Sequence, residues 1–218
     1  MGTNKTKIKI CCISSLEEAN LAIKYGASAI GLVSEMPSGP GVISEELIFK
    51  IAGQIPSHIY SFLLTSKVTA EEIIQQHKRC KTTTLQIVDA VDIDVYEKLR
   101  SSLHGIKIVQ VIHVQDESSL DEALKVEKYV DAILLDSGNQ KLKIKELGGT
   151  GRTHDWRVSR KIRENIKVPM YLAGGINPDN AKRAIEEVIP YSLDICSGVR
   201  IDGKLNEELL KKLFLNIA

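Results

Sequence analysis

Residues 171–180 read YLAGGINPDN, a short apolar run that ends in two glycines before a predicted helix. The stretch DICSGV at residues 194–199 repeats this pattern after the next apolar run. A glycine turn has no Cβ in the way, so backbone N–H groups can approach an anion closely. The first turn of a helix adds unpaired donors and a favourable dipole. Both stretches are therefore typical of strand-to-helix turns that can bind an anion.

The rest of the chain repeats this strand-turn-helix unit. Short runs rich in β-branched residues alternate with amphipathic helical patterns, which predicts parallel strands joined by helical crossovers. The predicted strands begin near Ile8, Ala29, Ile59, Thr84, Lys107, Asp131, Val168 and Tyr191. Eight such units, with no second compositional regime in 218 residues, predict the α/β class and a single (β/α)8 TIM barrel domain over residues 1–218.

Helix-capping residues support this division of the chain. Ser15 precedes the predicted helix Leu16–Tyr25 with Glu18 three residues on, which is a capping box, and Gly26 stands at the stop position. Three further predicted helices open with a capping side chain followed by two glutamates; the capping residues are Ser44, Thr69 and Asn206.

Charge and hydropathy exclude several classes of partner. The 29 basic and 28 acidic side chains nearly cancel, so no basic field favours nucleic acid. No apolar run approaches the roughly 20 residues of a membrane span, and no apolar signal-peptide core follows the polar N-terminus. We therefore expect a cytoplasmic protein with neither nucleic-acid nor membrane partners, and both a monomer and a homodimer fit the sequence.

The four cysteines are Cys11, Cys12, Cys80 and Cys196. They form no CxxC pair and no Cys/His ligand spacing, so we expect no metal site. Disulfides are uncommon in a core-rich cytosolic chain, which predicts reduced thiols.

Chemistry in β/α barrels lies at the carboxyl ends of the strands, and a phosphate site after strands seven and eight is common. The two glycine turns occupy those two places in the predicted barrel. We therefore predict that Gly174, Gly175, Ser197 and Gly198 bind phosphate. The alternative is two ordinary strand-to-helix turns, because a tight turn also needs glycine.

Polar side chains end two other predicted strands. Cys11 and Cys12 close the first strand, and neighbouring residues of a strand point to opposite faces. We therefore expect one thiol at the barrel mouth and the other toward the helical layer, unless both are small core residues. Asp136 directly follows the apolar residues of the sixth strand, so it lies at the mouth as a functional group or as a loop cap. A long loop, residues 137–154, comes next and is either a substrate cover or a simple connection.

Five pieces of the chain occur together in a recognisable order: KIC at 9–11, LD at 135–136, GGTGRTHDW at 148–156, LAGGINPDN at 172–180 and DICSGV at 194–199. They resemble the phosphoribosylanthranilate isomerase family of tryptophan biosynthesis, over nearly the whole chain. The resemblance implies an Amadori rearrangement of an N-substituted 5-phosphoribosylamine to a 1-amino-1-deoxyribulose 5-phosphate, with no metal or cofactor.

The resemblance also implies roles for single residues. Cys11 matches the general base that removes the proton from sugar C2. Asp136 matches the general acid that protonates the ring oxygen and opens the furanose to a Schiff base. The remaining predicted contacts to the sugar-phosphate substrate are Gly149, Gly151, Arg152 and Asp194.

The chain departs from the family pattern at five positions. Cys12 stands where the family has Gly, and Gly41 where it has the Arg thought to hold the anthranilate carboxylate. Val88 and Asp89 replace a His and a Gly, and Arg200 stands where Glu is common. Losing a bidentate carboxylate clamp is not a conservative change.

These departures keep two alternatives open: a diverged barrel isomerase or lyase for another sugar phosphate, and a non-catalytic phosphometabolite-binding protein. Arg152 and Arg200 are candidates for a replacement cation. His113, at the end of the fifth strand, either reaches the mouth or is a satisfied rim residue.

Overall fold

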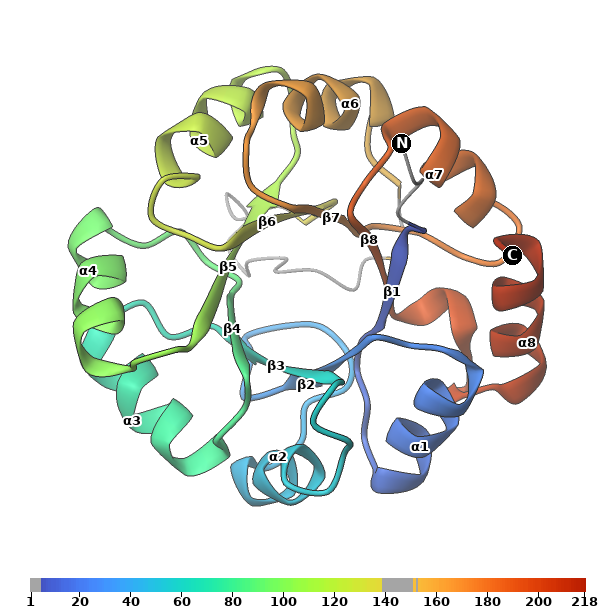
Figure 1. Cartoon of the computed structure of the whole chain (residues 1–218), viewed down its shortest axis with the longest axis horizontal. Helices are drawn as coiled ribbons and strands as arrows, with labels where there is room; N and C mark the ends of the chain where they lie inside the picture. Colours follow the sequence, from blue (N-terminus) through green and yellow to red (C-terminus); the bar gives the residue numbers. More distant parts are fainter. Residues whose placement is uncertain (1–4, 139–150, 152) are drawn as a thin grey trace.

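Eight parallel strands close into a barrel in the computed structural model, which describes residues 5–138, 151 and 153–218. The strands follow one another around the barrel in chain order, and the last pairs with the first (Figure 1). They are β1 (Lys7–Ile10), β2 (Ala29–Val33), β3 (Tyr60–Thr65), β4 (Thr84–Ile87), β5 (Lys107–His113), β6 (Ala132–Asp136), β7 (Met170–Leu172) and β8 (Ser192–Ile195). Each begins within two residues of its predicted start, so the predicted TIM barrel is confirmed.

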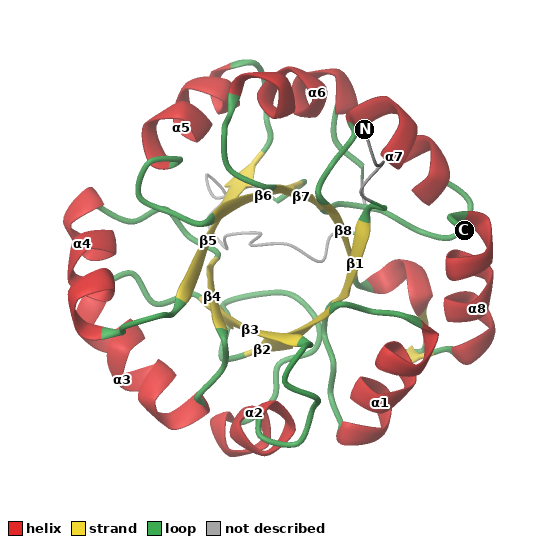
Figure 2. Cartoon of the chain, viewed as in Figure 1, coloured by secondary structure: helices red, strands yellow, loops and turns green. Residues whose placement is uncertain are grey.

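A ring of helices surrounds the barrel (Figure 2). They are α1 (Leu16–Tyr25), α2 (Glu45–Ala52), α3 (Ala70–Cys80), α4 (Ile93–Ser102), α5 (Ser118–Val126), α6 (Trp156–Asn165), α7 (Ala181–Val188) and α8 (Glu207–Asn216). After β8 the chain forms a 3-10 turn, η1 (Ser197–Val199), and a small hairpin of β9 (Arg200–Ile201) and β10 (Lys204–Leu205). Within the described part of the chain, none of the helices has the length and apolar character that a membrane crossing needs.

The predicted caps form. The Ser15 hydroxyl accepts a hydrogen bond from Glu18 N at 3.2 Å, and Gly26 ends α1 with φ +113°. Ser44, Thr69 and Asn206 cap their helices in the same way. The Glu18 carboxylate, however, accepts from Ser14 N at 3.0 Å, one residue before the position that a capping box requires.

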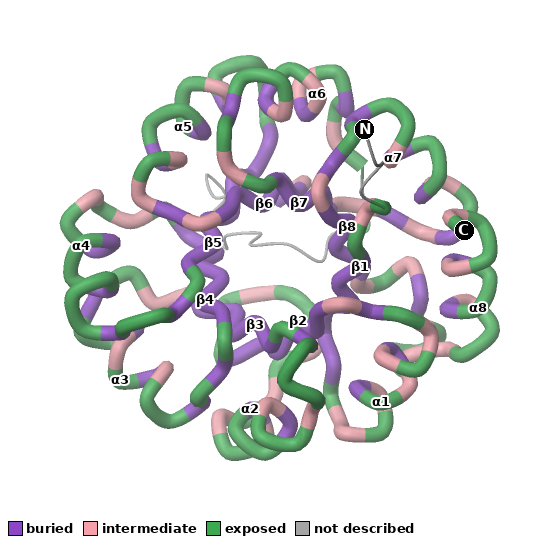
Figure 3. The backbone as a smooth tube through the Cα atoms, viewed as in Figure 1, coloured by how far each residue is buried: buried purple, intermediate pink, exposed green. Residues whose placement is uncertain are grey.

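Two apolar regions hold the barrel. The barrel strands are buried except at the first residues of β1, β3 and β5, whereas each helix buries only the side that faces them (Figure 3). One core region lies between strands and helices, and a second fills the barrel interior, with Phe62, Val109, Leu134 and Tyr171 among its members. A filled interior is the rule for this barrel, so a ligand can bind only at its ends.

Candidate active site

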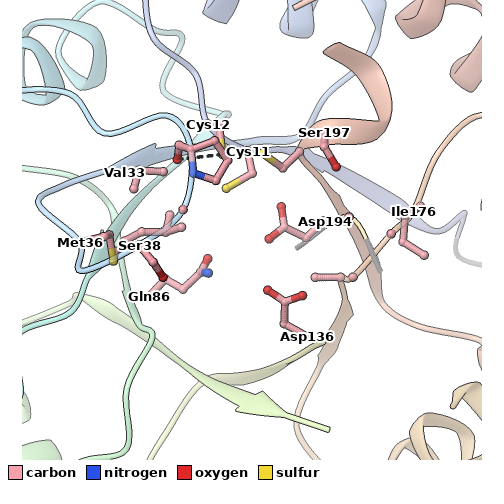
Figure 4. A pocket seen from close by; sticks show the side chains of 18 residues that line it. Cys11, Cys12, Val33, Met36, Ser38, Gln86, Asp136, Ile176, Asp194 and Ser197 are labelled. Atoms are coloured by element: carbon pink, nitrogen blue, oxygen red, sulfur yellow. Dashed lines mark hydrogen bonds between the residues drawn. The ribbon is translucent and has the colours of Figure 1, made fainter. Parts of the chain in front are cut away.

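A pocket opens at the carboxyl ends of the strands (Figure 4). Cys11 faces it from the residue after β1, Asp136 faces it from β6, and the turns after β7 and β8 form the wall between them. The loop after β2 forms the opposite wall with Met36, Ser38 and Pro40. The motifs that the sequence placed at separate strand ends therefore meet in one cavity.

Cys11 lies above a buried ion pair. The alternation of β1 points Lys9 and Cys11 to the same side, and Lys9 Nζ lies 3.6 Å from Cys11 Sγ. The pairing of β1 with β8 sets Lys9 beside Asp194, and Lys9 Nζ donates to Asp194 Oδ2 at 2.7 Å. Lys9 is fully buried, so this contact is shielded from solvent.

The ionisation of these groups follows from their contacts. A hydrogen bond from Cys12 and the charge of Lys9 lower the pKa of the Cys11 thiol, although burial opposes this. Burial also works against the charged form of Lys9, but the Asp194 carboxylate and the Cys11 thiol outweigh it, and the pKa of Lys9 is raised. Burial raises the pKa of Asp194, yet the 2.7 Å contact with Lys9 favours its carboxylate form. The site thus holds a cysteine whose lowered pKa favours the thiolate form.

Asp136 sits across the pocket, 9% exposed, with Oδ1 held by Ser137 N at 2.7 Å. His154 lies nearby; its Nε2 contacts Ser159 Oγ at 2.6 Å. Burial lowers the pKa of His154 against the attraction of the Asp136 carboxylate. His154 and the candidate acid therefore interact electrostatically. The sequence reasoning did not assign His154 a role, although it lies within the GGTGRTHDW motif.

The two glycine turns require glycine for steric reasons. Gly174 and Gly175 have φ of +82° and +63°. A Cβ on Gly198 would lie 2.1 Å from the carbonyl oxygen of Ile176, so no side chain fits there. Ser197 and both glycines of the first turn line the pocket, whereas Gly198 does not line it and instead packs against Ile176 and Asn177.

The predicted substrate contacts divide into two groups. Gly151 and Asp194 line the pocket, and a Cβ on Gly151 would lie 3.7 Å from Ser197 Oγ. Asp194 Oδ1 is buried and has no hydrogen-bond partner within the described residues. Gly149 and Arg152 lie outside the described residues.

Gln86 is a pocket residue that the sequence reasoning missed. It is 3% exposed, and its amide points into the cavity from the end of β4 (Figure 4). Its Oε1 is buried without a hydrogen-bond partner among the described residues. Gln86 lies on the same face of β4 as Thr84 and Val88, so strand alternation was the available signal.

Comparison with known proteins identifies the family. The sequence model described as N-(5'phosphoribosyl)anthranilate (PRA) isomerase matches residues 8–216. The chain belongs to the N-(5'-phosphoribosyl)anthranilate isomerase family. The resemblance read from the motifs is thereby confirmed.

Relatives named N-(5'-phosphoribosyl)anthranilate isomerase match nearly full length. The one from Methanocella arvoryzae is 30% identical over 210 residues, covering 96% of both chains. A second, from Methanosarcina mazei, is 34% identical and covers 93% of this chain and 89% of the relative. The Thermotoga maritima phosphoribosyl anthranilate isomerase structure is 27% identical with a TM-score of 0.83, covering 97% and 98% of the two chains. Another solved isomerase, with a TM-score of 0.80 and 25% identity, holds reduced 1-(o-carboxyphenylamino)-1-deoxyribulose 5-phosphate and has the same coverage.

Two departures from the family pattern, Gly41 and Arg200, both contact a third, Cys12. Cys12 has φ +60°, and both Cys11 and Cys12 line the pocket. The expectation that the two thiols face opposite sides is wrong, because Cys12 lies beyond β1 in a left-handed turn where strand alternation no longer applies. A Cβ on Gly41 would lie 2.6 Å from Cys12 Cβ, and Arg200 Nη2 donates to Cys12 O at 2.6 Å.

The remaining candidates for a cation at the pocket do not reach it. Arg200 is 6% exposed, pairs with Glu18 at 3.0 Å and does not line the pocket. His113 Nε2 donates to Val88 O at 2.9 Å, and this supports its interpretation as a rim residue. Among the described residues, no Lys or Arg lines the pocket, and no group of three or more His, Cys, Asp or Glu suits a metal ion.

Proposed function

We propose that the chain isomerises N-(5'-phosphoribosyl)anthranilate to 1-(o-carboxyphenylamino)-1-deoxyribulose 5-phosphate, with Asp136 as general acid and Cys11 as general base. The observation that carries the proposal is the placement of Cys11 and Asp136 in one pocket, at the ends of β1 and β6, with two glycine turns beside them. Family membership supplies the reaction class.

The first chemical step is ring opening. Asp136 donates a proton to the furanose ring oxygen as the C1–O bond breaks, and the anthranilate nitrogen lone pair forms the C1=N bond of an iminium ion. The hydrogen bond from Ser137 N fixes the orientation of the carboxyl group at the pocket. A general acid has to be held in this way, because proton transfer needs hydrogen-bond reach of the reacting atom.

The second step is proton removal from C2. The iminium group acidifies that proton, and the Cys11 thiolate accepts it while the C1=N electrons return to nitrogen, giving an enol with a C1=C2 bond. Tautomerisation of this enol to the C2 ketone completes the product. Cys12 and Lys9 favour the thiolate, so both support the base without touching C2.

The phosphate and ribose fix the substrate between these two groups. Backbone N–H groups in the turns at Gly174, Gly175 and Ser197 present donors to the phosphate dianion. The unpartnered Oδ1 of Asp194 and Oε1 of Gln86 are acceptors suited to ribose hydroxyl groups.

Loss of the substrate's anthranilate fluorescence during turnover by the purified protein tests the proposal. We expect Cys11→Ala and Asp136→Asn to lower kcat by about 100-fold or more, since general acid–base catalysis contributes 10²–10⁴. Cys80→Ala changes a buried cysteine at the end of α3 that does not line the pocket; it is the matched control and keeps wild-type kcat. No turnover by the wild-type protein, or full activity in both variants, contradicts the proposal.

One observation favours a second candidate, an isomerase for a phosphoribosylamine without an aromatic carboxylate. The wall formed by Val33, Met36, Ser38 and Pro40 carries no charge, and no cation lines the described pocket. N-(5'-phosphoribosyl)aniline, which lacks the carboxylate, separates the two. A kcat/KM for the aniline compound equal to or above that for the anthranilate compound supports the second candidate, and a tenfold preference for anthranilate excludes it.

A further inference from the structure

The turn that carries Cys11 has an unusual backbone. Cys12 has φ +60°, a region that residues with a Cβ enter at a conformational cost. Two of the other described non-glycine residues with positive φ, Lys81 and Ile189, are helix C-caps, where this geometry is common. Cys12 follows a strand instead, so something outside the turn has to hold it.

Arg200, which does not line the pocket, contacts this turn through its backbone. Its Nη2 donates to Cys12 O at 2.6 Å and to Cys11 O at 3.1 Å. These are the carbonyl groups on either side of the left-handed Cys12 φ and ψ angles. One guanidinium nitrogen therefore fixes the peptide planes that determine where the Cys11 side chain leaves the backbone.

Glu18 holds Arg200 in place. Its carboxylate receives Arg200 Nη1 at 3.0 and 3.2 Å and Nη2 at 3.1 Å. The two side chains are 6% and 13% exposed. Glu18 also accepts from Ser14 N at 3.0 Å and from Leu205 N at 2.8 Å, which ties the turn to the hairpin of β9 and β10. The pair is thus rigid, since moving either charge away would leave the other buried and unpaired.

The far side of the turn is blocked as well. Cys12 Sγ contacts Pro40 O at 3.7 Å, the interaction drawn in Figure 4. Gly41 packs so closely that a Cβ there would lie 2.6 Å from Cys12 Cβ. The turn is held between the loop after β2 and the Arg200 guanidinium.

We propose that Arg200 is a positioning residue for Cys11, acting through the backbone of residues 11 and 12, with Glu18 fixing Arg200. This inference rests on the proposed function for its kinetic consequences. Its structural consequence, which is the orientation and ionisation of the Cys11 thiol, does not depend on the substrate.

The test is a double-mutant cycle, in which Arg200→Met is made both in the wild-type protein and in the Cys12→Gly variant. Glycine adopts positive φ without a Cβ clash, so the turn with Gly at 12 needs less support. We expect Arg200→Met to lower kcat about tenfold or more with KM changed less than threefold, because a small misplacement of a reacting group has effects of this size. The same substitution in the Cys12→Gly background should lower kcat less than threefold.

A second readout needs no substrate. The pH profile of Cys11 alkylation by iodoacetamide, assigned by peptide mass spectrometry, reports its thiolate. Arg200→Met should move the midpoint of this profile upward by about half a pH unit or more, because the Cys11 thiol would no longer be held beside Lys9 and Cys12. Arg160→Met, an exposed arginine on α6 paired with Glu164, is the matched control and leaves both readouts at wild-type values.

Several outcomes overturn the inference. One is a kcat within twofold of wild type in folded Arg200→Met protein; another is an equal loss in both backgrounds. If Arg200→Met does not fold, Arg200→Lys and Glu18→Gln replace it, because each keeps part of the pair; a wild-type kcat and alkylation midpoint in both refute the positioning role. An inactive wild-type protein refutes the proposed function alone, and the alkylation profile still decides the inference.

Discussion

The Lys9–Asp194 ion pair offers the most direct test of the site's electrostatics. The two charges meet at 2.7 Å, Lys9 is 0% exposed and Asp194 is 7% exposed. Lys9→Met keeps the length of the side chain but leaves the Asp194 carboxylate buried without its partner. Removing one member of a buried pair costs about 3–5 kcal/mol of unfolding free energy.

The same substitution changes the titration of Cys11. The hydrogen bond from Cys12 and the charge of Lys9 hold the pKa of Cys11 below that of an ordinary thiol. A base with a lowered pKa is ionised at lower pH, so the rising limb of kcat/KM lies on the acid side of the usual thiol range. Without Lys9 the thiolate loses its nearest cation, and this limb moves to higher pH.

Urea denaturation at pH 7 and the pH dependence of kcat/KM measure the two effects. Lys9→Met/Asp194→Asn should recover most of the lost stability, because it removes both charges. Lys212→Met is the control, since its pair with Asp179 is about half exposed and such pairs contribute about 0–1 kcal/mol. A Lys9→Met protein as stable as this control, or one with an unmoved acid limb, refutes the reasoning.

Three further substitutions test the packing of the turns, each by urea denaturation against wild type. Gly198→Ala places a Cβ 2.1 Å from a carbonyl oxygen and should cost about 3 kcal/mol or prevent folding; a loss below about 1 kcal/mol contradicts the steric argument. Gly41→Ala should cost about 1–3 kcal/mol, and less in the Cys12→Gly background, whereas equal losses would mean that residues 12 and 41 do not interact. Ser15→Ala removes the N-cap of α1 and should cost about 1 kcal/mol; an unchanged midpoint would show that the cap is dispensable.

The barrel was predictable because its signals are local. Strand starts follow from apolar runs, and helix starts follow from caps such as Ser15 and Asn206, each read within a few residues. The pocket members Cys11, Asp136 and Gly174 were predictable for a related reason. The fold brings the carboxyl ends of all strands together, so a reactive or ionisable side chain at a strand end already indicates the site.

The supporting contacts were not predictable, because they join distant parts of the chain. Lys9 is a charged residue in an apolar strand, and only the register with β8 shows that Asp194, 185 residues later, neutralises it. The sequence made Arg200 a candidate cation for the substrate. In the structure Arg200 pairs with Glu18, 182 residues away in sequence, and does not line the pocket. Local periodicity carries no information about such pairings.

The departures from the family pattern are physically coupled, and this affects how they can be interpreted. Gly41 leaves room for Cys12, and Cys12 in a left-handed turn is held by Arg200. A side chain at position 41 therefore costs stability while Cys12 is present, since its first carbon would lie 2.6 Å from the Cys12 Cβ, and a long side chain costs more than a methyl group. Gly41→Arg alone should abolish folding or expel the loop after β2. Only together with Cys12→Gly can it place a guanidinium at the pocket wall, and a lower KM for phosphoribosylanthranilate in the double variant than in Cys12→Gly alone would show that it does. An unchanged KM would mean that the wall is distant from the carboxylate, and the coupling would then concern the Cys11 turn only.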